Sequence, residues 1–161
     1  MSSFAIRAAT SADVPLLLAL IREMAAYERM PDKVLVKEDS IREHLFSPAP
    51  LASVFFAEED GEPVGYAIVY PVYSSYAGVA DLFLEDLFLR QPVRGKGYGK
   101  RFMAFLARHV KANGYRRLCW CVLTWNTPSI EFYERLGAIR DTDRYNYDLE
   151  GTALDDLARL N

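Results

Sequence analysis

A glycine-rich, basic stretch between an apolar run and a helical pattern constrains this chain more than any other part of its sequence. The apolar run covers residues 82–89, the loop reads Arg94-Gly95-Lys96-Gly97-Tyr98-Gly99-Lys100, and the helical pattern continues over residues 101–113. The order is therefore strand, loop, helix. A helix that begins in such a loop presents N–H groups without helical partners, and its dipole adds partial positive charge. The stretch predicts a binding site for a phosphate or pyrophosphate group.

Glycines and basic side chains in this loop support the same prediction. Three glycines allow unusual backbone dihedral angles and a close approach of an anion: Gly95, Gly97 and Gly99. Four basic residues concentrate positive charge there: Arg94, Lys96, Lys100 and Arg101. Two nucleotide-binding motifs do not fit. A P-loop requires G-x-x-x-x-G-K-[ST] and a dinucleotide fingerprint requires G-x-G-x-x-G early in a βαβ unit, whereas the spacing here is G-x-G-x-G, late in the chain.

Length, composition and charge limit the class of protein. We expect residues 1–161 to form a single domain, because the chain is long enough for one substantial core. Hydrophobic content of 51% and charged content of 25% are ordinary for a globular protein. No apolar run reaches the length of a membrane span and the N-terminal residues lack signal-peptide features, so we expect a cytoplasmic protein with no membrane partner. The net charge of −3 does not favour a nucleic acid as partner.

Cysteine and histidine are too few to predict a metal site. Cys119 and Cys121 flank Trp120, and on a strand they would lie on one face two residues apart. That geometry suits neither a mutual disulfide nor a complete set of metal ligands, so we expect two small core residues. The two histidines, His44 and His109, have no cysteine near them in the sequence. We therefore expect no metal site.

Charge is distributed unevenly along the chain. The glycine loop is basic, whereas residues 28–43 carry five acidic side chains: Glu28, Asp32, Glu38, Asp39 and Glu43. A basic pocket for an anionic cofactor and an acidic surface for a cationic substrate would fit this distribution. A solvated, acidic helix face is the alternative.

Hydrophobic periodicity and turn residues predict the remaining elements. Expected strands are Phe4–Arg7, Ser53–Glu58, Pro63–Tyr73, Val79–Leu89, Arg117–Leu123 and Ile139–Leu149. Expected helices are Val14–Tyr27 after a capping box at Thr10 and Asp13, about Lys37–Phe46, Arg101–Asn113, and Ser129–Leu136 followed by Gly137. Residues 152–160 form either a short helix or a frayed tail. This order predicts an α/β fold with a mixed sheet, in which the strands around the glycine-loop helix pair in parallel.

Four stretches together resemble the GNAT superfamily of acetyl-coenzyme-A-dependent N-acetyltransferases over nearly the whole chain. They are Ile6–Thr10 with Asp13, Ala26–Glu28, residues 84–99, and residues 125–138, and they are most similar to the diamine (spermidine/spermine) and thialysine branch. The resemblance implies a mostly antiparallel mixed sheet flanked by helices, with parallel strands splayed around the acetyl-coenzyme A (acetyl-CoA) site. It also implies direct transfer of acetyl to the primary amine of a small cationic substrate, without a covalent acyl-enzyme, by a homodimer.

Two residues match the catalytic positions of that family. An alkylamine with a pKa of about 10.4 is mostly protonated at neutral pH, so a base must remove a proton before the amine can attack. Glu85 matches this base, and we expect its apolar neighbours in the strand to desolvate the carboxylate and make it more basic. An ion-paired or exposed strand residue is the alternative. Tyr133 matches the general acid that protonates the leaving thiolate, and packing beside Phe132 is the alternative.

The resemblance assigns coenzyme contacts to both main chain and side chains. A bulge after the acidic residues of the central strand exposes an N–H to the thioester oxyanion. By position this involves Leu87, while Leu89 holds the pantetheine arm through its backbone. The other expected coenzyme contacts are Arg94, Gly95, Lys96, Gly97, Tyr98, Gly99, Lys100, Asn126, Ser129 and Tyr133.

The resemblance defines the substrate less closely. Five residues are expected to line the amine pocket: Tyr27, Glu28, Tyr76, Glu85 and Asp86. The two tyrosines would wall the pocket, with cation–π contact to the amine. In the loop at residues 73–78 the polyamine enzymes have an acid and a tryptophan, whereas this chain has serines and a tyrosine. The sequence therefore leaves open a polyamine, a shorter diamine, thialysine or another amino-acid amine, and also the length of the acyl chain.

The sequence leaves two other functions open. An acetyltransferase for a protein N-terminus or lysine would need an open groove in place of an acidic pocket. A non-catalytic acyl-coenzyme-A-binding module would need neither Glu85 nor Tyr133. The sequence also leaves open whether a dimer exchanges its last strand, and it gives no role to Tyr145 and Tyr147.

Overall fold

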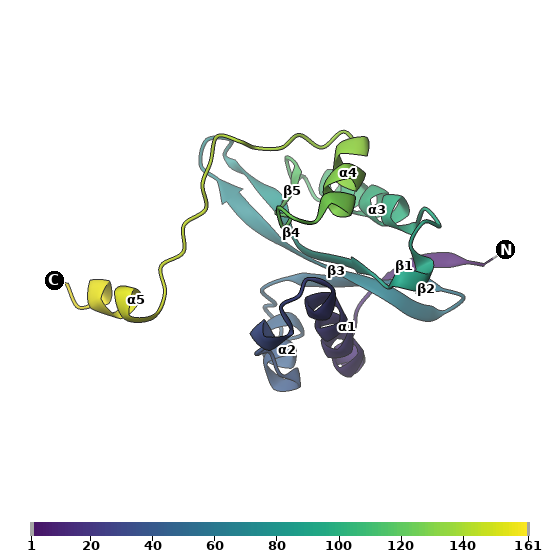
Figure 1. The fold of residues 1–161 in the computed structure, drawn as a ribbon, viewed down its shortest axis with the longest axis horizontal. Coiled ribbons are helices and arrows are strands. Elements are labelled where there is room, and N and C mark those ends of the chain that lie inside the picture. The colour runs from purple at the N-terminus through teal and green to yellow at the C-terminus, as the bar shows by residue number, and fades with distance from the viewer. Residues whose placement is uncertain (1, 161) are drawn as a thin grey trace. The chain divides into compact units, whose positions relative to one another are not determined.

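The structure is a computed structural model that describes residues 2–160 and contains a five-stranded sheet in the order β1-β2-β3-β4-β5 (Figure 1). The strands are β1 (Phe4–Ala8), β2 (Ser53–Glu59), β3 (Glu62–Ser74), β4 (Val79–Leu89) and β5 (Leu118–Trp120). Neighbouring strands are antiparallel except β4 and β5, which are parallel. The helices are α1 (Val14–Tyr27), α2 (Glu38–Leu45), α3 (Tyr98–Ala112), α4 (Thr127–Arg135) and α5 (Gly151–Ala158). The predicted α/β fold with a mixed, mostly antiparallel sheet is confirmed.

The chain groups into two compact units, Met1–Leu123 and Thr124–Asn161. The first unit contains the whole sheet together with α1, α2 and α3, and the second contains α4 and α5. A single domain over the whole chain stays a prediction. Within the described residues, no helix is both long and apolar enough to cross a membrane.

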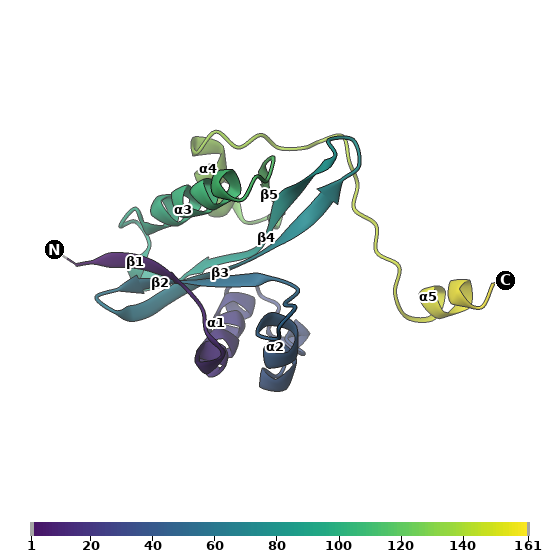
Figure 2. The same ribbon diagram turned by 180° about the vertical axis from the view of Figure 1, so that it is seen from behind.

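Helices cover both faces of the sheet in the first unit, with α1 and α2 on one face and α3 on the other (Figure 2). The core between the sheet and the first two helices consists of buried apolar side chains and one tyrosine: Val14, Leu17, Leu18, Leu20, Ile41, Val54, Phe56, Tyr66, Ile68 and Phe88. On α3, the apolar side chains recur at helical spacing and are buried: Phe102, Met103, Leu106 and Val110. Each face of the sheet therefore has its own apolar layer, which is why the strands read as nearly continuous hydrophobic runs.

Local sequence accounts for the first turns of the chain. The Thr10 N–H donates to the Asp13 carboxylate at 2.7 Å, which confirms the capping box before α1. Asp60 and Gly61 form the turn between β2 and β3 with φ of 52° and 85°. Two consecutive positive φ angles are typical of the tight turn that matches the twist of a hairpin.

A buried carboxylate fixes the parallel pair β4–β5 where the two strands begin. The Asp81 carboxylate accepts hydrogen bonds from Arg116 at 2.8 and 2.7 Å and from Arg117 at 2.8 Å. The pairing then runs from Leu82 opposite Leu118 to Leu84 opposite Trp120. β5 ends at Trp120, so β4 continues beyond Leu84 towards the glycine loop without a β5 partner.

Several predicted boundaries are wrong by a few residues and one predicted strand is wrong altogether. Helix α3 begins at Tyr98 rather than Arg101, and β5 is shorter than the predicted strand at 117–123. Residues 139–149 were predicted to form a strand, but in the structure they are neither helix nor strand and are exposed. A strand needs a hydrogen-bonded neighbour, and alternating apolar residues alone do not supply one. Residues 152–160 were predicted as a short helix or a frayed tail, and the structure has a short helix there, α5.

Candidate active site

The glycine loop joins the end of β4 to the start of α3, as predicted. Gly95 and Gly97 both have φ of 82°, a left-handed conformation that residues with side chains rarely adopt. Gly97 is the N-cap of α3, and the first helical hydrogen bond runs from the Arg101 N–H to the Gly97 carbonyl at 3.1 Å. The N–H groups of residues 98–100 precede that bond, so they are the helix donors available to an anion.

The basic side chains of the loop have partners of their own. The Lys96 ammonium lies 2.8 Å from the Glu59 carboxylate, which also accepts a hydrogen bond from the Tyr98 hydroxyl. These two donors lower the pKa of Glu59. The Tyr98 ring is buried and stacked on Phe4 with centroids 4.3 Å apart. In this structure, therefore, Lys96 and Tyr98 tie the loop to β2 and β1, while the exposed Lys100 and the backbone face solvent.

Arg94 connects the loop to the C-terminal end of α1. Its Nε donates to the Leu89 carbonyl at 2.9 Å, and its guanidinium lies 4.3 Å from the centre of the Tyr27 ring. The same guanidinium lies 5.8 Å from the centre of the Phe88 ring. Arg94 was predicted as a coenzyme contact and Tyr27 as a wall of the amine pocket. The structure places these two side chains against each other.

A β-bulge lies at the predicted base. In the ladder between β3 and β4, Ile68 is opposite Asp86 and Val69 is opposite Leu84, so Glu85 is the extra residue on β4. The resemblance placed the bulge after the acidic residues, whereas the structure places it at the first of them. Beyond the bulge Leu87 pairs with Ala67 and Leu89 with Gly65.

The bulge turns two consecutive carboxylates to the same face of the sheet. The Tyr66 hydroxyl donates to Asp86 at 3.0 Å, and the Tyr70 hydroxyl donates to Glu85 at 3.0 Å. Tyr66 and Tyr70 are four residues apart on β3, so their side chains lie on one face. That face is the one covered by α1 and α2, because Tyr66 belongs to their core.

The environment of Asp86 raises the pKa of its carboxyl group. Burial is the largest effect, and the negative charges of Glu85 and Glu28 act in the same direction, so the pKa of Asp86 rises to about 6. The hydrogen bond from Tyr66 opposes this rise because it favours the charged form. Burial and the nearby carboxylates also raise the pKa of Tyr66, which therefore stays a hydrogen-bond donor.

Glu85 lies in a more open environment than expected. Its side chain is exposed, so the prediction that apolar neighbours desolvate it is wrong. The reason is the bulge, which gives the enclosed position to Asp86 and leaves Glu85 nearer to solvent. Burial and the adjacent Glu85 raise the pKa of its partner Tyr70 to about 12.

Glu28 follows directly after α1 and is half-buried. Burial raises its pKa, and its charge acts on both Asp86 and Tyr66. The structure therefore brings Glu28, Glu85 and Asp86 into one acidic cluster, with Tyr27 next to Glu28 in the sequence. We call these three carboxylates together with Tyr66 and Tyr70 the acidic cluster below.

Tyr76 does not belong to this cluster within one chain. It is fully exposed at 101%, in the turn that joins β3 to β4. Six residues separate Val79, at the start of β4, from Glu85, which corresponds to about 20 Å along a strand. Tyr76 was predicted to wall the amine pocket, and this placement corrects that prediction for a single copy of the chain.

The predicted residues of the second unit lie at the start of α4 and near its end. Asn126 is buried and is the N-cap of the helix, where its side chain accepts from the Ser129 N–H at 3.4 Å. Tyr133 lies seven residues further on, half-buried, with its ring centre 5.2 Å from that of Phe132. Gly137 follows the helix with φ of 87°, as predicted for a C-terminal glycine.

Tyr66 and Tyr70 are the site residues that the sequence analysis missed. Both were seen only as part of the alternation along residues 63–73. A signal was present, because two tyrosines on one face of the strand can provide hydroxyl donors for two consecutive acids on a neighbouring strand. Within the described residues, no group of three or more histidine, cysteine, aspartate or glutamate side chains could hold a metal ion.

The comparisons with known proteins agree with the fold and the loop. Residues 18–138 match the model of the Acetyltransferase (GNAT) family. A thialysine N-epsilon-acetyltransferase of Sus scrofa is 32% identical over 98% of this chain and 99% of its own length. The L-ornithine N5-acetyltransferase NATA1 of Arabidopsis thaliana is 27% identical over 97% of this chain and 88% of its own length.

Two further similarities extend this comparison. A human spermidine/spermine N(1)-acetyltransferase-like protein 1 is 33% identical over 86% of this chain, which corresponds to 21% of that longer protein. An integron cassette protein of V. cholerae has a similar structure, with a TM-score of 0.82 and 25% identity over 98% of this chain and 99% of its own. With a family match over most of its length, the chain belongs to the GNAT family and is an acetyltransferase.

Proposed function

We propose that this acetyltransferase moves acetyl from acetyl-coenzyme A directly to the primary amine of a small cationic substrate. The amine is that of a thialysine-like amino acid or a short diamine, and the reaction passes through a ternary complex. The observation that carries the proposal is the acidic cluster, in which Glu28 and Glu85 both raise the pKa of Asp86 and tyrosines of β3 bond to the two acids of β4. Glu28 and Asp86 are half-buried, and like charges held together away from water are costly unless a cation neutralises them.

The two carboxylates of β4 have different tasks in this proposal. Glu85 is exposed, so it can pass a proton to water and act as the base that removes the proton of the ammonium group. Asp86 is enclosed and held by Tyr66, so it is suited to fix the cation in place. Tyr27 and Glu28 complete the cation site from the end of α1.

In this proposal the coenzyme binds at the glycine loop and along the part of β4 that has no β5 partner. Its pyrophosphate would bind the N–H groups at the start of α3, between Gly95, Gly97 and Gly99, with Lys100 adding charge. The pantetheine would run along the backbone of Leu87 and Leu89, where β4 no longer pairs with β5. Asn126 and Ser129 are expected to bind the coenzyme, and Tyr133 to protonate the leaving thiolate, on the basis of the family resemblance.

A short substrate is favoured over a long polyamine. In the loop at 73–78 this chain has Tyr76 where the polyamine enzymes have side chains that recognise a long amine. Tyr76 is fully exposed and lies far along the hairpin from Glu85. The relatives of Sus scrofa and Arabidopsis thaliana are named for thialysine and L-ornithine, two amino acids with a side-chain amine. A cluster of three carboxylates is sufficient to neutralise one ammonium group.

The test is coenzyme A release from acetyl-coenzyme A with a panel of amines. The panel contains thialysine, lysine, ornithine, putrescine, spermidine, spermine and a lysine-containing peptide, each with wild type, Tyr133→Phe and Tyr145→Phe. We expect turnover on an amino-acid amine or putrescine, a roughly hundredfold lower kcat for Tyr133→Phe, and no change for Tyr145→Phe, which removes an exposed hydroxyl of the same unit. Turnover on the peptide alone, or equal kcat for the three proteins, would contradict the proposal.

A homodimer and a cytoplasmic location are part of the same proposal. Exposed apolar side chains gather in the extended segment 139–149: Ile139 at 95%, Tyr145 at 87%, Tyr147 at 90% and Leu149 at 50%. Large apolar side chains in solvent mark a surface that another protein covers, here a second copy. Sedimentation velocity should give a dimer for wild type and a monomer for Tyr145→Ser combined with Tyr147→Ser; a monomeric wild type would refute it.

A further inference from the structure

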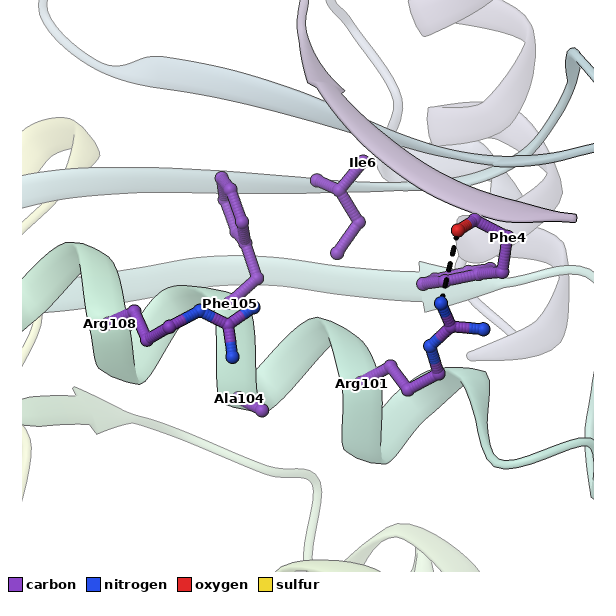
Figure 3. A pocket seen from close by; sticks show the side chains of 6 residues that line it. All are labelled: Phe4, Ile6, Arg101, Ala104, Phe105 and Arg108. Carbon is purple, nitrogen blue, oxygen red and sulfur yellow. Dashed lines mark hydrogen bonds between the residues drawn. The ribbon is translucent and has the colours of Figure 1, made fainter.

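A cavity outside the proposed active site lies between β1 and one side of α3. It has a volume of about 350 Å³ and is lined by Phe4, Ile6, Arg101, Ala104, Phe105 and Arg108. Figure 3 shows Phe4 and Ile6 pointing from β1 towards α3, with Arg101 and Arg108 at opposite ends of the helix segment. The volume lies within the range of roughly 300–1,000 Å³ that is usual for small-molecule sites.

The cavity lies on the other face of the sheet from the acidic cluster. Phe4 stacks on Tyr98 of α3, whereas Tyr66 and Asp86 lie on the face that α1 and α2 cover. Its helical residues recur at positions i, i+3, i+4 and i+7, which form one side of a helix. Occupation of this cavity therefore does not compete with an amine at Asp86.

The apolar part of the cavity is a fixed aromatic surface. Phe105 packs edge-to-face on Phe55, with ring centres 5.0 Å apart, and lies stacked 6.4 Å from His109. Phe4, Ile6 and Phe105 are half-buried, so part of each apolar side chain stays accessible. Ala104 has only a methyl group, which leaves space between the two arginines.

The two arginines of the cavity have no salt bridge to a carboxylate of residues 2–160. Arg101 and Arg108 lack such a partner although the chain has net charge −3 and most of its other arginines are paired with acids. The Arg101 guanidinium donates to the Phe4 carbonyl at 3.1 Å and lies 4.5 Å from the Phe4 ring centre. Arg108 is exposed and makes no hydrogen bond to a described residue, so it is the cation available to a ligand.

The edge of the sheet at this point favours a small ligand over an added strand. The Ser3 carbonyl and the Ala9 N–H bond towards β2, so by alternation the backbone groups of Phe4 and Ile6 point away from the sheet. Arg101 already occupies the Phe4 carbonyl and would block a strand that tried to pair there. A molecule that lies in the cavity without pairing to β1 meets no such obstacle.

We infer that this cavity is a second binding site, for a small amphiphilic anion. The carboxylate or phosphate of the ligand bonds to Arg108, and its apolar body lies over Ala104 and Phe105 towards Phe4. Arg101 and Arg108 are seven residues apart, which corresponds to about 10 Å along the helix axis, so the body is a short chain or one or two rings. A cation would be repelled, and a neutral polar molecule would leave the aromatic surface in contact with hydroxyl groups.

Binding can be measured on the intact protein with a fluorescent anion of this class. The probe is 8-anilinonaphthalene-1-sulfonate, titrated in the presence of saturating coenzyme A so that the coenzyme site is filled. Octanoate is then added as competitor, with octylamine as a matched control that has the same chain and a cationic head. We expect octanoate to displace the probe and octylamine not to do so.

Two variants and one control connect that binding to the cavity. Arg108→Gln should weaken octanoate about tenfold, the size expected for one charge-assisted hydrogen bond at an exposed site, and Ala104→Leu should abolish binding by filling the space. Lys111→Gln removes an exposed charge of α3 outside the cavity and should change nothing. Displacement by octylamine as well, or unchanged affinity in Arg108→Gln, would each overturn the inference. If Ala104→Leu does not fold, the affinity of Arg108→Gln for octanoate still shows whether the anion binds in this cavity.

Discussion

The carboxylates of Glu85 and Asp86 lie on the same face of the sheet although the two residues are consecutive in β4. Regular alternation would point them to opposite faces. The extra residue at Glu85 changes the alternation, and each carboxylate then accepts a hydrogen bond of 3.0 Å from a tyrosine of β3. Two acids at one face, with different exposure, lead to three predictions about catalysis and stability.

Removal of the Tyr66 hydroxyl should shift the pH dependence of catalysis. The hydrogen bond from Tyr66 favours charged Asp86, so Tyr66→Phe should raise the pKa of Asp86 further above about 6. One such bond corresponds to about one pH unit, and the acidic limb of kcat/KM should move up by that amount. The matched control is Tyr70→Phe, which removes the bond to Glu85 instead. An acidic limb that moves in Tyr70→Phe and not in Tyr66→Phe would show that Asp86 is not the group that titrates.

Replacing the base should leave an enzyme that depends on deprotonated substrate. Glu85→Gln should lower kcat roughly a hundredfold at neutral pH. Its rate should then rise with pH up to about 10, because the fraction of free amine rises. Asp86→Asn, in contrast, should mainly raise KM for the amine. The measurement is kcat and KM between pH 6 and 10; a Glu85→Gln enzyme that stays equally slow at pH 10 would argue against its role as base.

The enclosed Asp86 should make the fold less stable at neutral pH. Its pKa is raised in the folded state to about 6, so the folded protein binds a proton that the unfolded chain, with a pKa of about 3.9, has already lost. Stability should therefore fall as the pH rises from about 4 to above 6. Asp86→Asn should raise the free energy of unfolding at pH 7 by about 2 kcal/mol and have little effect at pH 4. Urea unfolding at both pH values measures this, and equal effects would refute it.

Asp81 should affect the pH dependence of stability in the opposite direction to Asp86, because its ion pairs stabilise the fold and are lost at low pH. The hydrogen bonds from Arg116 and Arg117 lower the pKa of Asp81 to about 2, so its contribution is complete above about pH 4 and is lost as the pH falls towards 2. Asp81→Asn should lower the free energy of unfolding at pH 7 by about 1 kcal/mol, since the arginines are partly exposed and water screens the pair. The loss should disappear near pH 2. Thermal unfolding of the variant and wild type across this range would reveal a constant difference if the ion pairs were irrelevant.

Patterns that depend on neighbouring residues in the sequence predicted most of the fold. The boundaries of α1 and β4 are those that periodicity predicts, and the parallel pair around the loop follows from the order of the elements. The segment 139–149 shows the limit of such patterns. Its alternating apolar residues predict a strand, but a strand also needs a partner, and the partner is a tertiary property.

The candidate site was predicted in its residue types and only partly in its geometry. Glu85 and Asp86 lie at one face of the sheet, and their membership of one functional site stays a prediction. Which of the two is enclosed depends on a bulge that no local sequence pattern predicts. Arg94 was expected at an anion because of its neighbours, and its stacking on Tyr27 depends on where α1 ends in space. Tyr76 was expected near Glu85, and the length of the hairpin separates them.

The bulge in β4 also has a consequence for how a site of this kind can arise or disappear. A bulge places one extra residue in a strand while the pairs before and after it remain, so every later side chain keeps the face of its partner on the neighbouring strand. Deletion of Glu85 would therefore restore a regular ladder and leave Asp86 as the single acid of that strand at this face. A homologous protein with that deletion could keep the sheet, the loop and the helices, and yet have lost the pair of charges that distinguishes a cationic acceptor.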